Sequence, residues 1–215
     1  VFTSKAVSVC EVHRRRTHFE ETGFAQFELH NKLSDEAGRF RAFLKNEGFS
    51  ASQAVLSLSS RHIMASRFDV PGNLQQAQLA GAARLKIESS LDIPFEQIEA
   101  DYIASEGALN VFVITKAALK ERLDFLRSAG LTPVAAGCIA SVLQPEEQGL
   151  SVFPVTGGFE LACRTGSALS DVDFISSENA GDEPESAVRS YVQAQKLKGS
   201  LPEESPVNMP EKPSE

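Results

Sequence analysis

Residues 66–71 (SRFDVP), 91–98 (LDIPFEQI), 111–114 (VFVI) and 128–133 (SAGLTP) decide the fold of this chain. The first two stretches each contain a proline, which marks the end of a regular element because it lacks an amide donor. The third is an unbroken apolar run, typical of a buried strand. The fourth joins a glycine to a proline, as at the end of a helix. The middle of the chain is therefore predicted to read strand, helix, hairpin, helix.

The periodicity between these stretches places the individual elements. Asn73 and Gln76 form a capping-box pattern at the start of a long helix. Gly130 stands where helices commonly end in the left-handed conformation. The predicted elements are a helix over 73–91, a hairpin of strands 99–105 and 109–115, a helix over 116–129, and a strand or a helix over 134–143.

Upstream of this region the pattern predicts two strands, a helix and two more strands. Ser34 precedes two acidic residues, which favours it as a helix N-cap, and Gly48 is the predicted stop of that helix. The strands are predicted over residues 1–12, 17–28, 55–59 and 63–70.

Downstream, three strands and one helix are predicted, over 150–155, 159–164, 169–176 and from Pro184 to about Lys198. From Gly199 the composition changes to Pro, Glu and Ser with almost nothing to bury, which predicts a disordered tail or linker. A partial sheet exposes strand edges, so we expect a partner, a second copy or a further segment to protect it.

Composition and charge exclude several classes of function. The 215 residues carry a formal net charge of −8, of which residues 171–215 contribute −6 through four basic and ten acidic groups. The near-neutral remainder is a poor match for nucleic acid or an anionic membrane surface, so we expect neither as a partner. No apolar run reaches the ~20 residues that span a bilayer, and no secretory signal opens the sequence. Because Val1 is not an initiator methionine, we expect a fragment.

No sequence motif for catalysis is present. Neither of the glycine-rich phosphate motifs occurs, and no serine or cysteine stands in a nucleophile pattern. The four histidines and three cysteines lack metal-site spacing, and we expect the cysteines to be buried reduced thiols. We interpret the carboxylates of residues 20–21 and 92–101 as solvated charges rather than as a catalytic pair or a metal site. Residues 14–16 (RRR) are interpreted as the solvated end of a hairpin.

Gly157 and Gly158 are the candidate cofactor-binding residues. They follow Thr156 between two predicted strands, where backbone amides can approach a phosphate. A plain hairpin turn explains the pair equally well, so both interpretations stand at this point.

The order of the motifs across residues 54–143 resembles the PilM family of type IV pilus assembly proteins and the related cytoplasmic part of GspL in type II secretion systems. The resemblance is carried by the proline-closed strand at 66–71, the passage from residue 93 to Asp101 and Tyr102, the apolar strand at 111–114, and the helix that ends at 128–133.

That family has the actin-like fold, so the resemblance implies an α/β chain with an actin-like first lobe, an inserted small α+β subdomain and a partial second lobe. The implied parts are residues 1–60 with 131–149 for the first lobe, 61–130 for the inserted subdomain, 150–198 for the start of the second lobe and 199–215 for the tail or linker.

Two departures from the actin-like pattern bear on nucleotide binding. Actin-like ATPases hold phosphates and Mg²⁺ with an acidic loop at the start of each lobe. Residues 1–7 resemble the strand after the first loop, so its aspartate is absent from this chain. Residues 153–158 (FPVTGG) keep the glycines of the second loop without a carboxylate for a metal. The resemblance therefore implies a degenerate site with Gly157 and Gly158 as its remnant and no metal or catalytic residues. ATP and Mg²⁺ are expected only if the first loop lies upstream of Val1.

The resemblance implies a cytoplasmic scaffold rather than an enzyme, peripheral to the inner membrane through a partner. The expected partners are the PilN-like cytoplasmic tail of an inner-membrane pilus or secretion protein, a secretion ATPase and a second copy of the chain. One alternative is an active actin-like ATP-binding protein whose first phosphate loop lies upstream. Another is a small-molecule-binding domain of an unrelated α/β fold.

Overall fold

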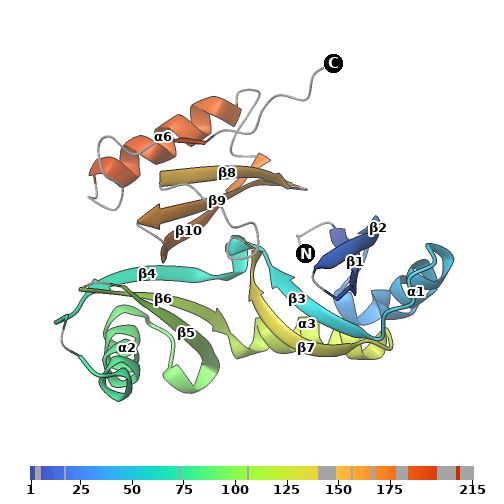
Figure 1. Ribbon diagram of the computed structural model, residues 1–215, viewed down its shortest axis with the longest axis horizontal. Coiled ribbons are helices and arrows are strands. Elements are labelled where there is room, and N and C mark those ends of the chain that lie inside the picture. Colours follow the sequence, from blue (N-terminus) through green and yellow to red (C-terminus); the bar gives the residue numbers. More distant parts are fainter. Residues whose placement is uncertain are drawn as a thin grey trace. The chain divides into compact units, whose positions relative to one another are not determined.

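The computed structural model describes residues 1–2, 6–16, 18–72, 74–105, 107–139, 149–155, 157–165, 168–177, 184–197 and 207–208 (Figure 1). The chain divides into two compact units. Unit 1 consists of Val1–Ser59 and Ala117–Ile139, and unit 2 of Ser60–Lys116 and Ala140–Glu215.

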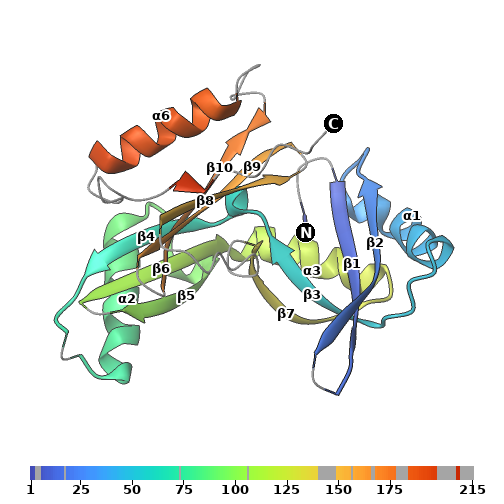
Figure 2. The same ribbon diagram turned by 45° about the horizontal axis from the view of Figure 1, so that its top comes forward.

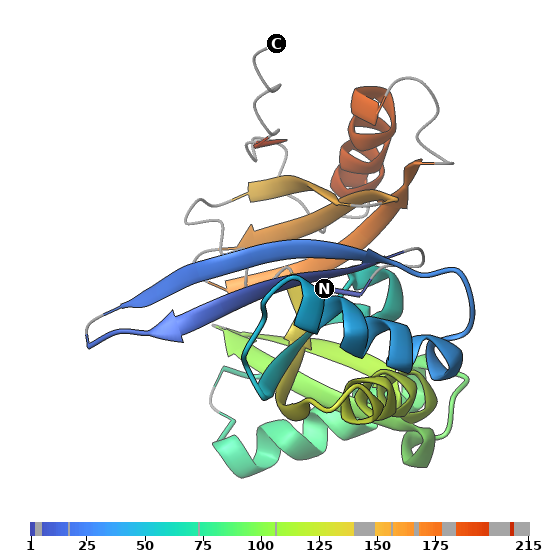
Figure 3. The ribbon, with the colours of Figure 1, turned by 90° about the vertical axis from the view of Figure 1, so that its right-hand side faces the viewer.

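Unit 1 contains two pairs of strands and two helices (Figure 2). The antiparallel hairpin of β1 and β2 is the long blue element in Figure 3, and β3 and β7 pair in parallel. A parallel pair requires a crossover, and α3 lies in the connection that leads to β7. The bounds are β1 (Ala6–Arg14), β2 (Phe19–Glu28), α1 (Leu33–Asn46), β3 (Gln53–Leu58), α3 (Lys116–Ser128) and β7 (Thr132–Cys138).

The core of unit 1 is built around four phenylalanines from different elements. Phe40 of α1 contacts Phe27 of β2 and Phe125 of α3, with ring centroids 5.2 and 4.9 Å apart. Phe2 meets Phe125 edge to face at 5.5 Å. Aromatic pairs at such distances add to the free energy gained from burying their apolar surface. These contacts hold both helices to the hairpin.

The helix ends of unit 1 confirm one predicted signal and correct another. Gly48, one residue beyond the C-cap of α1, has φ +80°, and Gly130, after α3, has φ +90°, as expected for C-terminal glycines. The predicted N-cap Ser34 is wrong, because α1 begins at Leu33 with Lys32 as the N-cap and no capping side chain on Lys32. The carboxylate of Glu36 instead accepts bonds from the amides that precede the helix.

The first half of unit 2 is a three-stranded antiparallel sheet with strand order β4-β6-β5, and α2 packs on one face. Gln75, not Asn73, caps α2, since its amide donates to Gln78 Oε1 at 2.8 Å; Asn73 lies outside the described residues. The bounds are η1 (Ser60–His62), β4 (Met64–Asp69), α2 (Gln76–Ser90), η2 (Phe95–Gln97), β5 (Ile98–Ser105) and β6 (Ala108–Thr115). The core consists of Leu79, Ala83, Ile87, Ile98, Leu109, Val111 and Val113.

The second half of unit 2 is a sheet with strand order β10-β9-β8-β11, whose apolar core includes Val188 of α6. Three antiparallel strands are followed by α6, and β11 then pairs in parallel with β8. The bounds are β8 (Gly149–Val155), β9 (Gly158–Thr165), β10 (Ala168–Ser176), α6 (Pro184–Leu197) and β11 (Val207–Asn208). β11 falls inside the segment for which the sequence predicts disorder; the other residues of 199–215 lie outside the described part.

Two further expectations are settled by the strands. Residues 132–138 form β7, so the segment 134–143 begins as a strand rather than a helix, and residues 140–143 lie outside the description. None of the three cysteines forms a disulfide, as predicted, but only Cys163 is buried, whereas Cys138 is half-buried and Cys10 is exposed. Cys10 pairs in register with Phe24 of β2, which is exposed as well.

Candidate functional site

Gly157 lies in the turn between β8 and β9, and Gly158 is the first residue of β9. Gly157 has φ +91°, which favours glycine, and its carbonyl accepts a bond from the Ser177 amide at 2.9 Å. A Cβ on Gly158 would lie 2.1 Å from the Ile175 carbonyl oxygen and 2.8 Å from the Phe174 ring. The turn is therefore tied to β10, and packing alone accounts for the glycine at position 158. Phosphate binding at this turn stays a prediction; Thr156 lies outside the described residues.

The carboxylates near the β4-β6-β5 sheet do not gather into a cation site. Among the described residues, no group of three or more His, Cys, Asp or Glu side chains is placed to hold a metal ion. Glu99 faces Lys116 at 3.8 Å, and Asp101 accepts a bond from the Tyr102 amide at 2.8 Å. Both side chains have roles within their own sheet and its adjoining helix.

Glu11 is a buried carboxylate that sequence reasoning missed. It lies on β1 with 9% exposure, and its Oε1 accepts bonds from the amides of Ser50 and Ala51 at 2.8 and 2.7 Å. The amide of Ser50 is the main cause that holds the pKa of Glu11 below its usual 4.5, against the opposing effect of burial. Glu11 thus links the segment before β3 to the β1–β2 hairpin.

Glu36 has a comparable structural role at the start of α1. It is fully buried, and it accepts bonds from the amide and the side-chain amide of Asn31, both at 2.9 Å, and from Arg39. Burial by itself would raise the pKa of Glu36, but these donors outweigh it and keep the pKa below the usual 4.5. A negative charge in the first turn also suits the helix dipole.

Glu160 of β9 is the third buried carboxylate, with no exposed surface. Its Oε2 accepts a bond from the Ser60 amide at 2.9 Å, across 100 residues of sequence. This bond joins η1 to the second sheet of unit 2. Glu11, Glu36 and Glu160 each bind at least one backbone amide, so each has a structural role that explains its burial.

Residues 14–16 lie at the end of β1 and the tip of the hairpin, as predicted. Arg14, Arg15 and Arg16 are exposed, and Arg15 pairs with Glu20 across the hairpin at 2.5 Å. Glu20 therefore offsets part of the basic charge at this tip.

Large apolar side chains are exposed on two pairs of strands in unit 1. Phe24 of β2 and Val12 of β1 are 65% and 52% exposed, and Val55 of β3 and Val134 of β7 are 66% and 54% exposed. Successive strand residues alternate between faces, so Phe24 lies opposite the buried Phe27. Exposed apolar groups of this size mark a candidate interaction surface, which we call the open face of unit 1.

Comparisons with known proteins identify the architecture. No protein-family model and no curated protein matches the sequence. A chain of the PilM–PilN type IV pilus biogenesis complex superposes with TM-score 0.67 and 16% identity over 90% of this chain. The cytoplasmic domain of EpsL, an inner-membrane component of the type II secretion system of Vibrio cholerae, superposes with TM-score 0.65 and 11% identity; the match covers 97% of this chain and 80% of that one. The chain has a PilM/GspL-like fold.

This fold confirms the predicted α/β actin-like class. A protein of Bacteroides thetaiotaomicron with an actin-like ATPase fold gives a TM-score of 0.49, with 10% identity, over 97% of this chain and 83% of that one. The chain spans 64% of the length of the matched chain in the PilM–PilN complex. None of its described helices is both long and apolar enough to cross a membrane.

Proposed function

We propose that this chain is a cytoplasmic scaffold of a type IV pilus or type II secretion assembly, and that it binds the cytoplasmic tail of an inner-membrane partner similar to PilN. The observation that supports this most is the superposition of 90% of the chain on a component of the PilM–PilN complex. A protein with this role would be held at the inner membrane through its partner. A secretion ATPase and a second copy of the chain are further proposed partners.

Two features of the site agree with a scaffold rather than an enzyme. The buried carboxylates Glu11, Glu36 and Glu160 accept bonds from backbone amides and hold the fold together. The open face of unit 1 carries Phe24 and Val55 with about two thirds of their surface exposed. Apolar side chains in such a setting suit contact with a protein segment.

The test is co-purification of the tagged chain from cross-linked membranes of its native cell, with partners identified by mass spectrometry. We expect an inner-membrane pilus or secretion component with wild-type chain and a severalfold loss of it with Phe24→Ser. Gln26→Ser is the matched control, because Gln26 is also exposed on β2. Recovery of no such component with the wild-type chain would contradict the proposal.

One observation favours a second candidate function, ATP binding. Phe2 pairs in parallel with Leu58, and its amide donates to the Ser57 carbonyl at 3.2 Å. Backbone groups alternate along a strand, so those of Gln53 and Val55 point to this same edge of β3. Among the described residues no named strand pairs with this edge. A strand upstream of Phe2 would fit beside β3 and would bring the first phosphate loop of an actin-like site.

Calorimetric titration with Mg·ATP distinguishes the two functions. It is made on this chain and on a form lengthened by the upstream coding sequence. Binding of the longer form at about 1 μM, which corresponds to about 8 kcal/mol, would favour the ATP-binding protein. The absence of heat and of a thermal shift in both forms is the result that the scaffold proposal expects.

A further inference from the structure

β10 forms one end of its sheet in the described part of unit 2, with β9 as its one hydrogen-bonded strand, and it also lies close to β4 and η1. The Ser177 amide bonds to the Gly157 carbonyl, and the register of β10 on β9 continues that pairing. Because amides alternate along a strand, the odd-numbered residues direct theirs toward β9, and Val172 and Phe174 direct theirs outward. Val172 and Phe174 thus have outward amides at the edge of β10.

Both outward amides are bonded to the aspartate that precedes them. The Phe174 amide donates to Asp173 Oδ1 at 2.7 Å, and the Val172 amide donates to Asp171 Oδ1 at 2.9 Å. Carboxylates placed on an edge strand hinder unspecific pairing with other strands. Asp173 is exposed, and its carboxylate places a negative charge at this edge.

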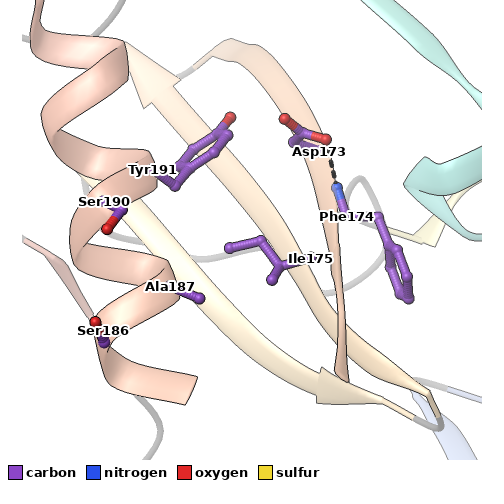
Figure 4. Close-up of a pocket in the computed structure, with 7 residues that line it drawn as sticks. All are labelled: Asp173, Phe174, Ile175, Ser186, Ala187, Ser190 and Tyr191. Carbon is purple, nitrogen blue, oxygen red and sulfur yellow. Dashed lines mark hydrogen bonds between the residues drawn. The ribbon is translucent and has the colours of Figure 1, made fainter. Parts of the chain in front are cut away.

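A cavity of about 490 Å³ lies between this edge and α6 (Figure 4). Asp173, Phe174 and Ile175 line one side of it. Asp173 and Ile175 share the face of β10 that is turned toward α6, whereas the Phe174 side chain points away from α6, so the cavity lies over this face at the end of the sheet. Ser186, Ala187, Ser190 and Tyr191 of α6 line the other side.

The residues that line the cavity indicate which kind of ligand it can bind. Asp173 is its one charged side chain, and it is exposed. Ala187 and Ile175 offer apolar contact, and the hydroxyls of Ser186 and Ser190 offer hydrogen bonds. An edge strand beside a helix is the arrangement in which an extended peptide joins a sheet, with main-chain bonds for affinity and pockets for alternate side chains.

We propose that the β10 edge binds an extended basic segment of a partner protein as an added strand. A carbonyl of the segment takes over the Phe174 amide from Asp173, and the released carboxylate pairs with a lysine or arginine of the segment. An apolar side chain of the segment enters the cavity against Ala187 and Ile175. This surface belongs to unit 2, and its occupation does not depend on the tail binding proposed for the open face of unit 1.

Fluorescence anisotropy with two labelled model peptides tests the charge preference. The first is Gly-Lys-Val-Lys-Val-Lys-Gly with blocked ends, and the second replaces each lysine with glutamate. We expect the basic peptide to bind the whole chain about tenfold more tightly than the acidic one. Its lysines can form ion pairs with Asp173, whereas the glutamates of the acidic peptide are repelled. Equal affinities of the two peptides, or no binding of either, would overturn the proposal.

Two pairs of variants locate the binding. Asp173→Asn is expected to reduce the preference for the basic peptide to below about threefold. Asp101→Asn removes the same kind of cap on β5 and is expected to leave the preference unchanged. Ser190→Trp fills the cavity and is expected to abolish binding. Gln193→Trp places the same bulk on an exposed α6 residue that is not one of the seven described lining residues, and it is expected to bind as the wild-type chain does.

Hydrogen exchange separates strand addition from simple charge attraction. The Phe174 amide is expected to exchange more slowly in the presence of the basic peptide, because a peptide carbonyl then shields it. An unchanged exchange rate at Phe174 while the peptide is bound would contradict an added strand. Circular dichroism of Ser190→Trp, compared with Gln193→Trp, shows whether the variant still folds.

Discussion

Unit 1 and the first sheet of unit 2 reach stability by different means. Unit 1 combines an aromatic cluster with carboxylates that accept bonds from backbone amides, as Glu11 does at Ser50 and Ala51. The β4-β6-β5 sheet has an aliphatic core, with Leu109 and Val111 at or below 1% exposure. The stability of unit 1 therefore depends on the ionisation of buried acids, whereas that of the sheet depends on close apolar packing.

The largest effect is expected from Phe40→Ala, which removes the ring that joins α1, β2 and α3. Deleting a buried phenylalanine costs about 3–5 kcal/mol through lost burial and the cavity left behind. Hydrogen exchange followed by mass spectrometry should show faster exchange in α1, β2 and α3 and unchanged exchange in β4, β5 and β6. Equal acceleration in both regions would remove the distinction between them and indicate one cooperative core.

Leu109→Ala is the corresponding change in the aliphatic core. Leu109 has no exposed surface, and its loss is expected to cost about 2–5 kcal/mol. Here exchange should accelerate in α2, β4, β5 and β6 and stay unchanged in the β1–β2 hairpin. Leu85→Ala serves as the control, since Leu85 of α2 is 68% exposed and its removal should change little.

Glu11→Ala tests the part that the buried acids play in unit 1. It leaves the amides of Ser50 and Ala51 without their acceptor, which costs about 1–3 kcal/mol. Glu11→Gln keeps an acceptor oxygen and should cost less in a denaturant titration at pH 7. The proposed role of Glu11 fails if the two variants are equally stable.

Acid should affect the two regions in different ways. The pKa of Glu11 and that of Glu36 are below their ordinary value of 4.5, so the stability that their ionised forms contribute is present above pH 4.5 and is lost as the pH falls through the lower folded-state values. Hydrogen exchange measured between about pH 5 and pH 3 and corrected for intrinsic rates should show unit 1 opening before the β4-β6-β5 sheet. Glu11→Gln should make the hydrogen exchange of unit 1 less dependent on pH.

The smallest effect is expected at the hairpin tip. Arg15 and Glu20 form an exposed pair, and such pairs contribute about 0–1 kcal/mol. Arg15→Ala should leave the midpoint of thermal unfolding nearly unchanged. A marked shift would show that the basic tip takes part in the stability of unit 1.

The sequence predicted most of the local structure and little of the long-range structure. Gly48 and Gly130 ended helices as expected, because a helix end depends on a few neighbouring residues. The roles of Glu11, Glu36 and Glu160 were missed, because the residues next to a carboxylate in the sequence give no sign that distant or preceding amides will bind it. The pairing of β11 with β8 was missed for the same reason, since two residues in a Pro- and Glu-rich stretch carry no strand pattern.

The candidate site was predictable only in its residue types. The two glycines pointed to a turn, and the structure adds that the β10 backbone leaves no room for a side chain at Gly158. Residues 169–176 were predicted as a strand, but the alternation of aspartates and apolar residues does not show that the strand lies at an edge. Whether a strand is at an edge depends on the order of all strands in its sheet, and a local pattern does not contain that order.

The division of unit 1 into Val1–Ser59 and Ala117–Ile139 has a consequence for the order of events on the ribosome. β3 is made early, but its partner β7 begins at Thr132 and is made only after residues 59–131 have been synthesised. At about 5–20 residues per second that delay lasts about 4–15 s. During this time the β4-β6-β5 sheet, whose contacts are local, has ample time to fold. The β4-β6-β5 sheet of unit 2 can therefore fold before the β3–β7 pair of unit 1 forms.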